Sequence, residues 1–97
     1  MKHSIIIEDE ALEETNDAYR WYEHQKKGLG EKFLESLDKL YEYIDKFPNA
    51  NPQKYQQQRQ AILAKFPYVI MYKIENNCII IYAVFHTSRN PLKKYRK

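Results

Sequence analysis

Two side chains able to do chemistry follow directly on an apolar run near the end of the chain. Residues 83–91 read AVFHTSRNP, so His86 and Arg89 stand three residues apart where the run CIIIYAVF stops. An arginine guanidinium is always charged and binds phosphate through two donors, and a histidine exchanges a proton near neutral pH. The pattern has two interpretations. Either a strand ends here in a polar turn, or a buried strand presents a histidine and an arginine on a working surface.

The charges of the chain are divided between its two halves. Residues 8–47 hold twelve of the thirteen acidic residues and six basic ones, which gives this half a net charge of −6. Residues 48–97 hold nine basic residues and a single acid, Glu75, which gives +8. This division indicates one face suited to a polyanion.

Length and composition predict one soluble domain over residues 1–97. Hydrophobic residues make up 43% of the chain and charged residues 30%, as in globular proteins. The single cysteine, Cys78, excludes an internal disulfide, and with only three histidines we expect no structural zinc site and no cofactor. No secretory signal or membrane-spanning run is visible, so a cytoplasmic location is expected.

The first half of the chain predicts a short strand and two helices. Residues 3–7 read as a strand, and apolar residues recur at helical spacing over residues 8–27 and again over about 29–47. The first stripe contains Ala11, Leu12, Thr15, Ala18, Tyr19 and Tyr22, and the second contains Phe33, Leu37, Leu40, Ile44 and Phe47. Gly28 separates the two helices and Pro48 ends the second, which predicts an antiparallel helical hairpin.

The second half predicts strands. Residues 48–53 form a loop, residues 54–64 read as one strand, and residues 68–75 and 78–86 are strongly β-type. A two-residue turn at residues 76–77 joins the last two strands. In the resulting register Ile74 faces Ile79, Tyr72 faces Ile81 and Ile70 faces Ala83, while Val69, Met71, Ile80, Tyr82 and Val84 occupy the other face.

Both faces of this predicted hairpin are therefore apolar. The order of elements predicts an α+β fold, with an N-terminal strand and an antiparallel helical hairpin packed on a mostly antiparallel sheet. In such a fold the helices cover only one face of the sheet, so we expect the other face to need a partner.

Three segments carry a resemblance to a known family. They are WYEHQKKGLGEKF at residues 21–33, RQAILAKFPYVIMY at residues 59–72 and AVFHTSRNPLKKYR at residues 83–96. With these segments the chain resembles the RelE/ParE superfamily, the toxins of bacterial type II toxin–antitoxin systems. The resemblance implies growth inhibition, a role in plasmid stabilisation and a stable complex with a cognate antitoxin.

The resemblance also implies two rival activities, because RelE-type members cut messenger RNA on the ribosome whereas ParE-type members block DNA gyrase and are not nucleases. In the nucleases of the family, basic residues of the middle strands act with an arginine after the last long strand and a tyrosine six residues later. Arg89 and Tyr95 match that spacing, and Arg59 is similar to the first basic residue of the middle strands. Ala61 and Tyr68, however, stand where further basic residues are expected.

Metal-free cleavage of RNA needs a group that moves protons and a fixed positive charge beside the phosphate. The candidate catalytic residues are Arg59, His86, Arg89 and Tyr95, and the candidate phosphate-binding residues are Lys54, Lys93, Lys94 and Arg96. Structural roles compete with these assignments. Arg59 can neutralise carboxylates, Arg89 can cap a strand or pair with a helix acid, His86 can bond the backbone, and Tyr95 can pack on the core. Trp21 and Tyr22 are expected to pack inside the helical hairpin.

The sequence thus predicts the toxin of a type II pair, with ribosome-dependent cleavage of messenger RNA by a metal-independent endoribonuclease as the preferred activity. The partners are then the ribosome and messenger RNA. The alternative is a non-enzymatic inhibitor of DNA gyrase. A further alternative is a binding module of the same fold that is not toxic.

Overall fold

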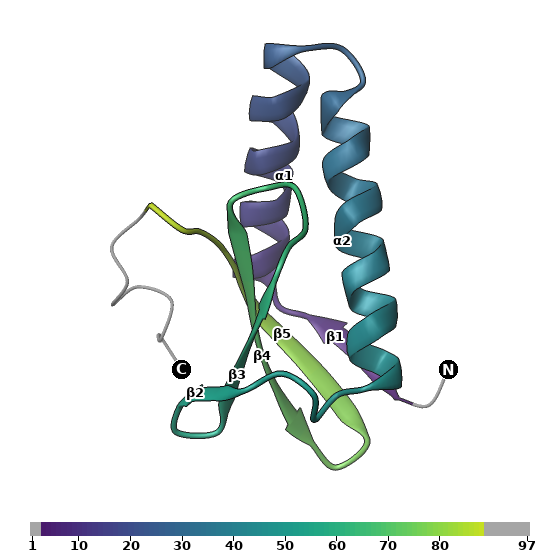
Figure 1. Ribbon diagram of the computed structural model, residues 1–97, viewed down its shortest axis with the longest axis vertical. Helices are drawn as coiled ribbons and strands as arrows, with labels where there is room; N and C mark the ends of the chain where they lie inside the picture. Colours follow the sequence, from purple (N-terminus) through teal and green to yellow (C-terminus); the bar gives the residue numbers. More distant parts are fainter. Residues whose placement is uncertain (1–2, 89–97) are drawn as a thin grey trace.

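A helical hairpin lies against one face of a five-stranded sheet in the computed structural model, which describes residues 3–88 (Figure 1). The elements, in chain order, are β1 (Ser4–Ile7), α1 (Asp9–Gln25), α2 (Leu29–Lys46), β2 (Gln53–Tyr55), β3 (Gln58–Ile62), β4 (Tyr68–Glu75) and β5 (Cys78–His86). The strand order is β1-β5-β4-β3-β2, in which β1 is parallel to β5 and every other pair is antiparallel. The predicted α+β fold is confirmed.

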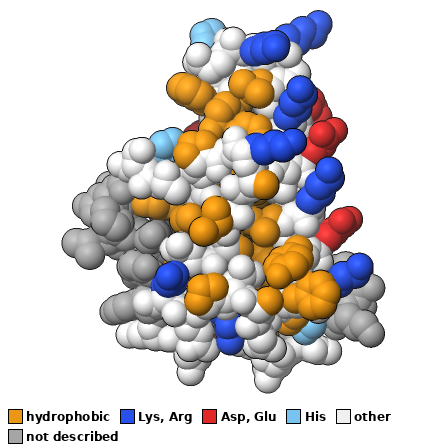
Figure 2. Space-filling view, in the orientation of Figure 1, with side chains coloured by type: hydrophobic (Ala, Val, Ile, Leu, Met, Phe, Trp, Pro, Cys, Tyr) orange, Lys and Arg blue, Asp and Glu red, His pale blue; other side chains and the backbone are white. Residues whose placement is uncertain are grey.

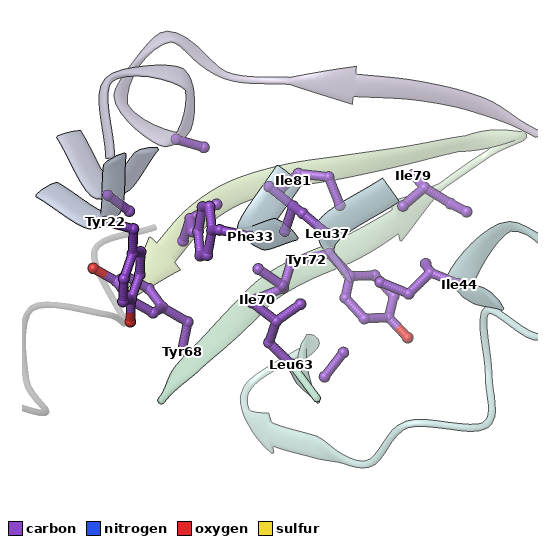
Figure 3. Close-up of a cluster of buried hydrophobic side chains, with 14 residues drawn as sticks. Tyr22, Phe33, Leu37, Ile44, Leu63, Tyr68, Ile70, Tyr72, Ile79 and Ile81 are labelled. Atoms are coloured by element: carbon purple, nitrogen blue, oxygen red, sulfur yellow. The ribbon is translucent and has the colours of Figure 1, made fainter. Parts of the chain in front are cut away.

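Both helices form where the apolar stripes predict them, and both bury those stripes against the sheet. The stripe residues that are buried are Ala11, Ala18 and Tyr22 of α1 and Phe33, Leu37 and Ile44 of α2. Figure 3 shows Phe33 and Leu37 meeting Ile70, Tyr72 and Ile81 from the strands. Leu12 and Phe47 remain 44% and 53% exposed, because they lie at the margins of the buried stripes. Within residues 3–88, neither helix is long and apolar enough to cross a membrane.

The junction between the helices is fixed by a carboxylate and two glycines. The Glu23 carboxylate accepts hydrogen bonds from the backbone N–H groups of Gly28 and Gly30, each at 3.0 Å. These amides belong to the start of α2, where backbone donors have no partner inside the helix and a negative charge is favourable. Gly28 adopts φ +89°, and a Cβ atom on Gly30 would stand 2.8 Å from the carbonyl oxygen of Tyr19. The segment at residues 21–33 is therefore explained by the architecture of the hairpin.

The predicted strand over residues 54–64 is wrong as a single element. The chain instead forms two short antiparallel strands, β2 and β3, which turn at Gln56 and Gln57. Gln56 adopts φ +54°. The turn escaped prediction because it is made of glutamines and contains no glycine, proline or asparagine.

The predicted β4–β5 register is confirmed near the turn at residues 76–77 and is wrong farther from it. Ile74 pairs with Ile79 and Tyr72 with Ile81, as predicted, but Ile70 pairs with Val84 and Met71 with Ala83. A β-bulge at Tyr82 places one extra residue on β5, which reverses the facing of every later residue on that strand. Val84 therefore joins the cluster beneath the helices, and Ala83 lies on the opposite face.

The bulge is tied to the first helix. The backbone N–H of Val84 donates to the Glu14 carboxylate of α1 at 2.9 Å. A bulge interrupts the regular ladder of hydrogen bonds, and a buried N–H without an acceptor costs about 1–3 kcal/mol. The carboxylate supplies that acceptor and connects two segments that are 70 residues apart in sequence.

The second face of the sheet is not an exposed apolar patch. Val69, Met71, Tyr82, Ala83 and Phe85 form a buried cluster there, each with at most 4% of its surface exposed. The expectation that this face lies open for a partner is therefore wrong for these residues. Burying both faces suits a strand pair that is apolar on both sides.

Candidate functional site

Arg59, a predicted catalytic residue, is bound to the loop that follows α2. Its Nη1 donates to the carbonyl oxygens of Asn49 and Asn51 at 3.3 and 2.5 Å, and its Nη2 donates to Oδ1 of Asn49 at 3.2 Å. These partners are neutral oxygens rather than the carboxylates suggested by the sequence. The guanidinium therefore fastens residues 48–52 to β3.

Tyr72, which pairs with Arg59 across β3 and β4, completes this attachment. Its hydroxyl donates to the carbonyl oxygen of Pro48 at 2.8 Å and accepts from Nδ2 of Asn51 at 3.2 Å. Burial raises the pKa of the Tyr72 phenol above its usual value, while the Asn51 bond and the Arg59 charge oppose that rise. The phenol stays protonated at neutral pH, which keeps its hydrogen bond to Pro48 in place.

Replacing Arg59 with alanine is expected to lower the free energy of unfolding by about 1–2 kcal/mol, because the loop loses several hydrogen bonds. Toxicity should persist wherever the chain remains folded. Urea denaturation measures the first effect and a growth assay the second, with Lys27→Ala as the matched control because Lys27 is exposed and is not a candidate site residue. An Arg59→Ala chain of normal stability that has lost toxicity would instead assign Arg59 to substrate binding.

His86, the second candidate, closes the end of β5. Its Nδ1 accepts the backbone N–H of Ser88 at 3.1 Å, and its ring meets Tyr68 edge-on with 5.1 Å between centroids. The next residue, Thr87, donates its N–H to the carbonyl oxygen of Pro67 at 2.9 Å. These contacts match the structural role weighed for His86 in the sequence.

His86 also lines a cavity of about 380 Å³ between α1 and the end of β5. Glu14, Asp17 and Trp21 of α1 line it as well. Arg20 pairs with Asp17 at 2.7 Å and partly offsets its charge, but the Glu14 carboxylate at the wall still disfavours the entry of a phosphate, because like charges repel. The cavity is therefore poorly suited to the backbone of RNA.

The structure does not bring Arg59 and His86 together. Arg59 pairs with Tyr72 and His86 with Tyr68, four residues apart along β4. From strand dimensions their Cα atoms are roughly 16 Å apart. Lys54 lies on β2, at the edge of the sheet remote from β5. The remaining candidates, Arg89, Tyr95, Lys93, Lys94 and Arg96, lie outside the described residues.

The side chain of Trp21 is exposed, which the sequence prediction missed. It is 59% exposed beside the cavity, whereas its neighbour Tyr22 is buried among Phe33, Phe66 and Tyr68. The prediction that both aromatic residues pack inside the hairpin is therefore wrong for Trp21. The sequence could have indicated this exposure, because Trp21 does not fit the helical spacing of residues 11, 15, 18 and 22 that forms the stripe of α1.

Comparison with known proteins identifies the family. Residues 5–91 match the family described as the ParE toxin of the type II toxin–antitoxin system parDE. The chain belongs to this ParE toxin family. It is thus the toxin of a type II pair, as its resemblance to the RelE/ParE superfamily implied. A comparison with curated protein sequences gave no match.

Solved structures of both branches share the fold of this ParE-family toxin. A chain of the chromosomal ParDE system of P. aeruginosa is 15% identical, with a TM-score of 0.67 over 90% of this chain and 98% of that one. The isolated E. coli RelE toxin is 16% identical, with a TM-score of 0.67 over 95% and 92%. A chain of the intact E. coli RelBE complex is 17% identical, with a TM-score of 0.68 over 90% and 99%. At these identities the likeness defines the fold, which ParE and RelE toxins have in common.

Proposed function

We propose that this ParE-family toxin acts by binding a protein target, and that the target is DNA gyrase. The observation that supports this most directly is the engagement of Arg59. Its guanidinium donates to three oxygens of the loop after α2 instead of standing open to a phosphate. The sequence favoured RNA cleavage partly because Arg59 looked available for that purpose.

The middle strands add to this argument. Ala61 is fully buried on β3 and Tyr68 is 8% exposed on β4, at positions where the nucleases of the family are expected to carry basic residues. A metal-free nuclease needs fixed positive charge around the scissile phosphate. Within the described residues, the two candidates His86 and Arg59 stand far apart, and His86 lies beside two carboxylates.

Cleavage of messenger RNA on the ribosome is the second candidate. It is favoured by Arg89 and Tyr95, which keep the six-residue spacing of the family's nucleases. Both targets occur in the cytoplasm, where we propose that the toxin acts.

We also propose that a cognate antitoxin binds this toxin. Two of the structures with the same fold come from pairs of this kind, the ParDE system and the RelBE complex. A small domain of this type gains stability from any partner that binds only its folded form.

Expression of the chain without its antitoxin should separate these activities. A gyrase inhibitor should cause DNA breaks and filamentous growth while the 5′ ends of cellular messages stay unchanged. The purified chain should also block DNA supercoiling by gyrase. New message ends at ribosome-bound codons, with supercoiling unaffected, would instead establish the nuclease. Normal growth on expression would identify a non-toxic binding module.

A further inference from the structure

The cavity between α1 and the end of β5 is walled largely by aromatic rings. We call it the α1–β5 cavity, and its lining consists of Glu14, Asp17, Ala18, Trp21, Tyr22, Tyr68, Val84 and His86. Half of these residues carry a ring. The volume of about 380 Å³ falls within the range of pockets that hold small molecules, which is roughly 300–1,000 Å³.

The four rings follow one another at steep angles. Trp21 and Tyr22 meet at 86° with 5.1 Å between centroids, and Tyr68 and His86 meet at 86° with the same spacing. Tyr22 and Tyr68 connect the two pairs, at 62° and 6.3 Å (Figure 3). Tyr22 and Tyr68 are each 8% exposed and form the inner wall, whereas Trp21 is 59% exposed at the mouth. Rings at steep angles present π faces in several directions, as in the aromatic cages that bind ammonium groups.

The charge of α1 also favours a cation. This helix has six acidic residues and one arginine, whereas α2 mixes five acidic residues with three lysines (Figure 2). Two of the α1 acids, Glu14 and Asp17, lie on the cavity wall. The partner of Asp17, Arg20, is 69% exposed, so water weakens that pair. Glu14 accepts the Val84 N–H, but a carboxylate has about four acceptor positions and can accept further donors.

The shape of the cavity indicates an elongated ligand. Glu14 and Trp21 are seven residues apart on α1, which is about 10 Å along the helix axis. Ala18 and Val84 make part of the lining apolar, and both are buried. Within residues 3–88 no three histidine, cysteine or acidic side chains gather as metal ligands. A chain of methylene groups with ammonium groups along it therefore suits the cavity better than a compact metal ion.

We infer that the α1–β5 cavity binds an aliphatic polyamine, a methylene chain that carries two or more ammonium groups. One ammonium group pairs with Glu14, and another lies against the rings of Trp21 and Tyr22. The methylene chain between them packs on Ala18 and Val84. This inference does not depend on which target the toxin inhibits.

Trp21 is the single tryptophan of the chain, so its fluorescence reports directly on the cavity. Titration of the purified chain with putrescine or spermidine should change this fluorescence saturably, with half-saturation below about 1 mM. Butanediol of the same chain length as putrescine, which has hydroxyls in place of the ammonium groups, should leave the fluorescence unchanged. Sodium chloride at matched ionic strength should also leave it unchanged, which excludes a general effect of screening.

Replacing Glu14 with glutamine should weaken putrescine binding about tenfold, because the variant loses the charge but keeps an oxygen for the Val84 N–H. Glu13→Gln is the matched control, since Glu13 is exposed on the same helix and does not line the cavity. It should stay within about twofold of wild type. If Glu14→Gln lowers stability, Asp17→Asn replaces it, because Asp17 is exposed and lines the cavity.

Isothermal titration calorimetry of Trp21 variants tests the rings. Trp21→Leu should weaken putrescine binding about three- to tenfold, whereas Trp21→Phe should weaken it at most about twofold, because phenylalanine keeps a π face. Equal losses in the two variants would contradict a cation–π contact and overturn the assignment of the rings.

Two further outcomes would overturn the inference as a whole. The first is that neither polyamine binds wild type saturably, or that Glu14→Gln and Glu13→Gln bind putrescine equally well. The second is that putrescine does not bind, while Glu14→Gln weakens the binding of gyrase. In that case the cavity receives a side chain from a protein and not a small molecule.

Discussion

Replacing Phe33 with alanine should lower the free energy of unfolding of this ParE-family toxin by about 3–5 kcal/mol. Phe33 is fully buried, and its ring lies 5.4 Å from Tyr22, 5.4 Å from Phe66 and 5.3 Å from Tyr68. Each of these rings comes from a different part of the chain, so the cavity left by alanine separates α2 from α1 and from the sheet. The loss is comparable with the whole stability of many small domains, which is about 5–15 kcal/mol.

Urea or thermal denaturation followed by circular dichroism measures this loss, and the growth assay should show reduced toxicity in parallel. Phe33→Leu should cost less than alanine because it fills most of the space. Phe47→Ala is the matched control, since Phe47 is 53% exposed after the end of α2. Equal losses at Phe33 and Phe47 would show that the aromatic cluster does not hold the layers together.

Replacing Gly30 with alanine should cost about 2–3 kcal/mol through overpacking, although only one methyl group is added. The added carbon would lie 2.8 Å from the ring of Tyr19 and 2.8 Å from its carbonyl oxygen. The ring can move, but the carbonyl belongs to α1 and cannot move without separating the helices. The change should also displace the Gly30 N–H from the Glu23 carboxylate, which it meets at 3.0 Å.

Gly28→Ala is the comparison that isolates this effect. No atom lies within 4 Å of a Cβ on Gly28, so alanine meets only the strain of φ +89°. That strain costs about 1–2 kcal/mol, and Gly28→Asn should recover part of it because asparagine tolerates this conformation. Adding Tyr19→Ala to Gly30→Ala should restore only part of the lost stability, because the backbone oxygen remains. Full restoration by that double variant would contradict a backbone clash.

The sequence predicted those parts of the fold that depend on local periodicity. The 33-37-40-44 stripe defined α2, and the two asparagines at residues 76–77 set the register from Ile74 to Ile79. The predicted register was wrong beyond Tyr82. A bulge depends on how β5 fits against β4 and α1 rather than on the residue types of β5. The turn at Gln56 was not predicted for a related reason, since glutamine has no local preference for a positive φ.

The candidate site was less predictable than the fold. Arg59 was recognised as a cation suited to phosphate, but its partners are backbone oxygens of a loop whose path no local pattern specifies. The groove between α2 and the turn that joins β3 to β4, which Lys32, Lys39 and Lys65 help to line, was not foreseen either. Its lysines lie seven residues apart on α2 and on a turn 26 residues later, so only the folded chain brings them together. The charge division of the sequence pointed to the basic second half, which contains Lys65, but not to Lys32 and Lys39 of the acidic first half.

The pairing of β1 with β5 has a consequence for when the toxin becomes active. Within residues 3–88 these are the first and the last strands, yet they are neighbours, with Ser4 opposite Cys78 and Ile7 opposite Ile81. During translation β1 therefore has no partner until nearly all of the sheet has been synthesised and has left the ribosome. Contacts between such distant segments form late and slowly in folding. A nascent or truncated chain that ends before β5 therefore lacks the strand that β1 pairs with and cannot form this part of the sheet.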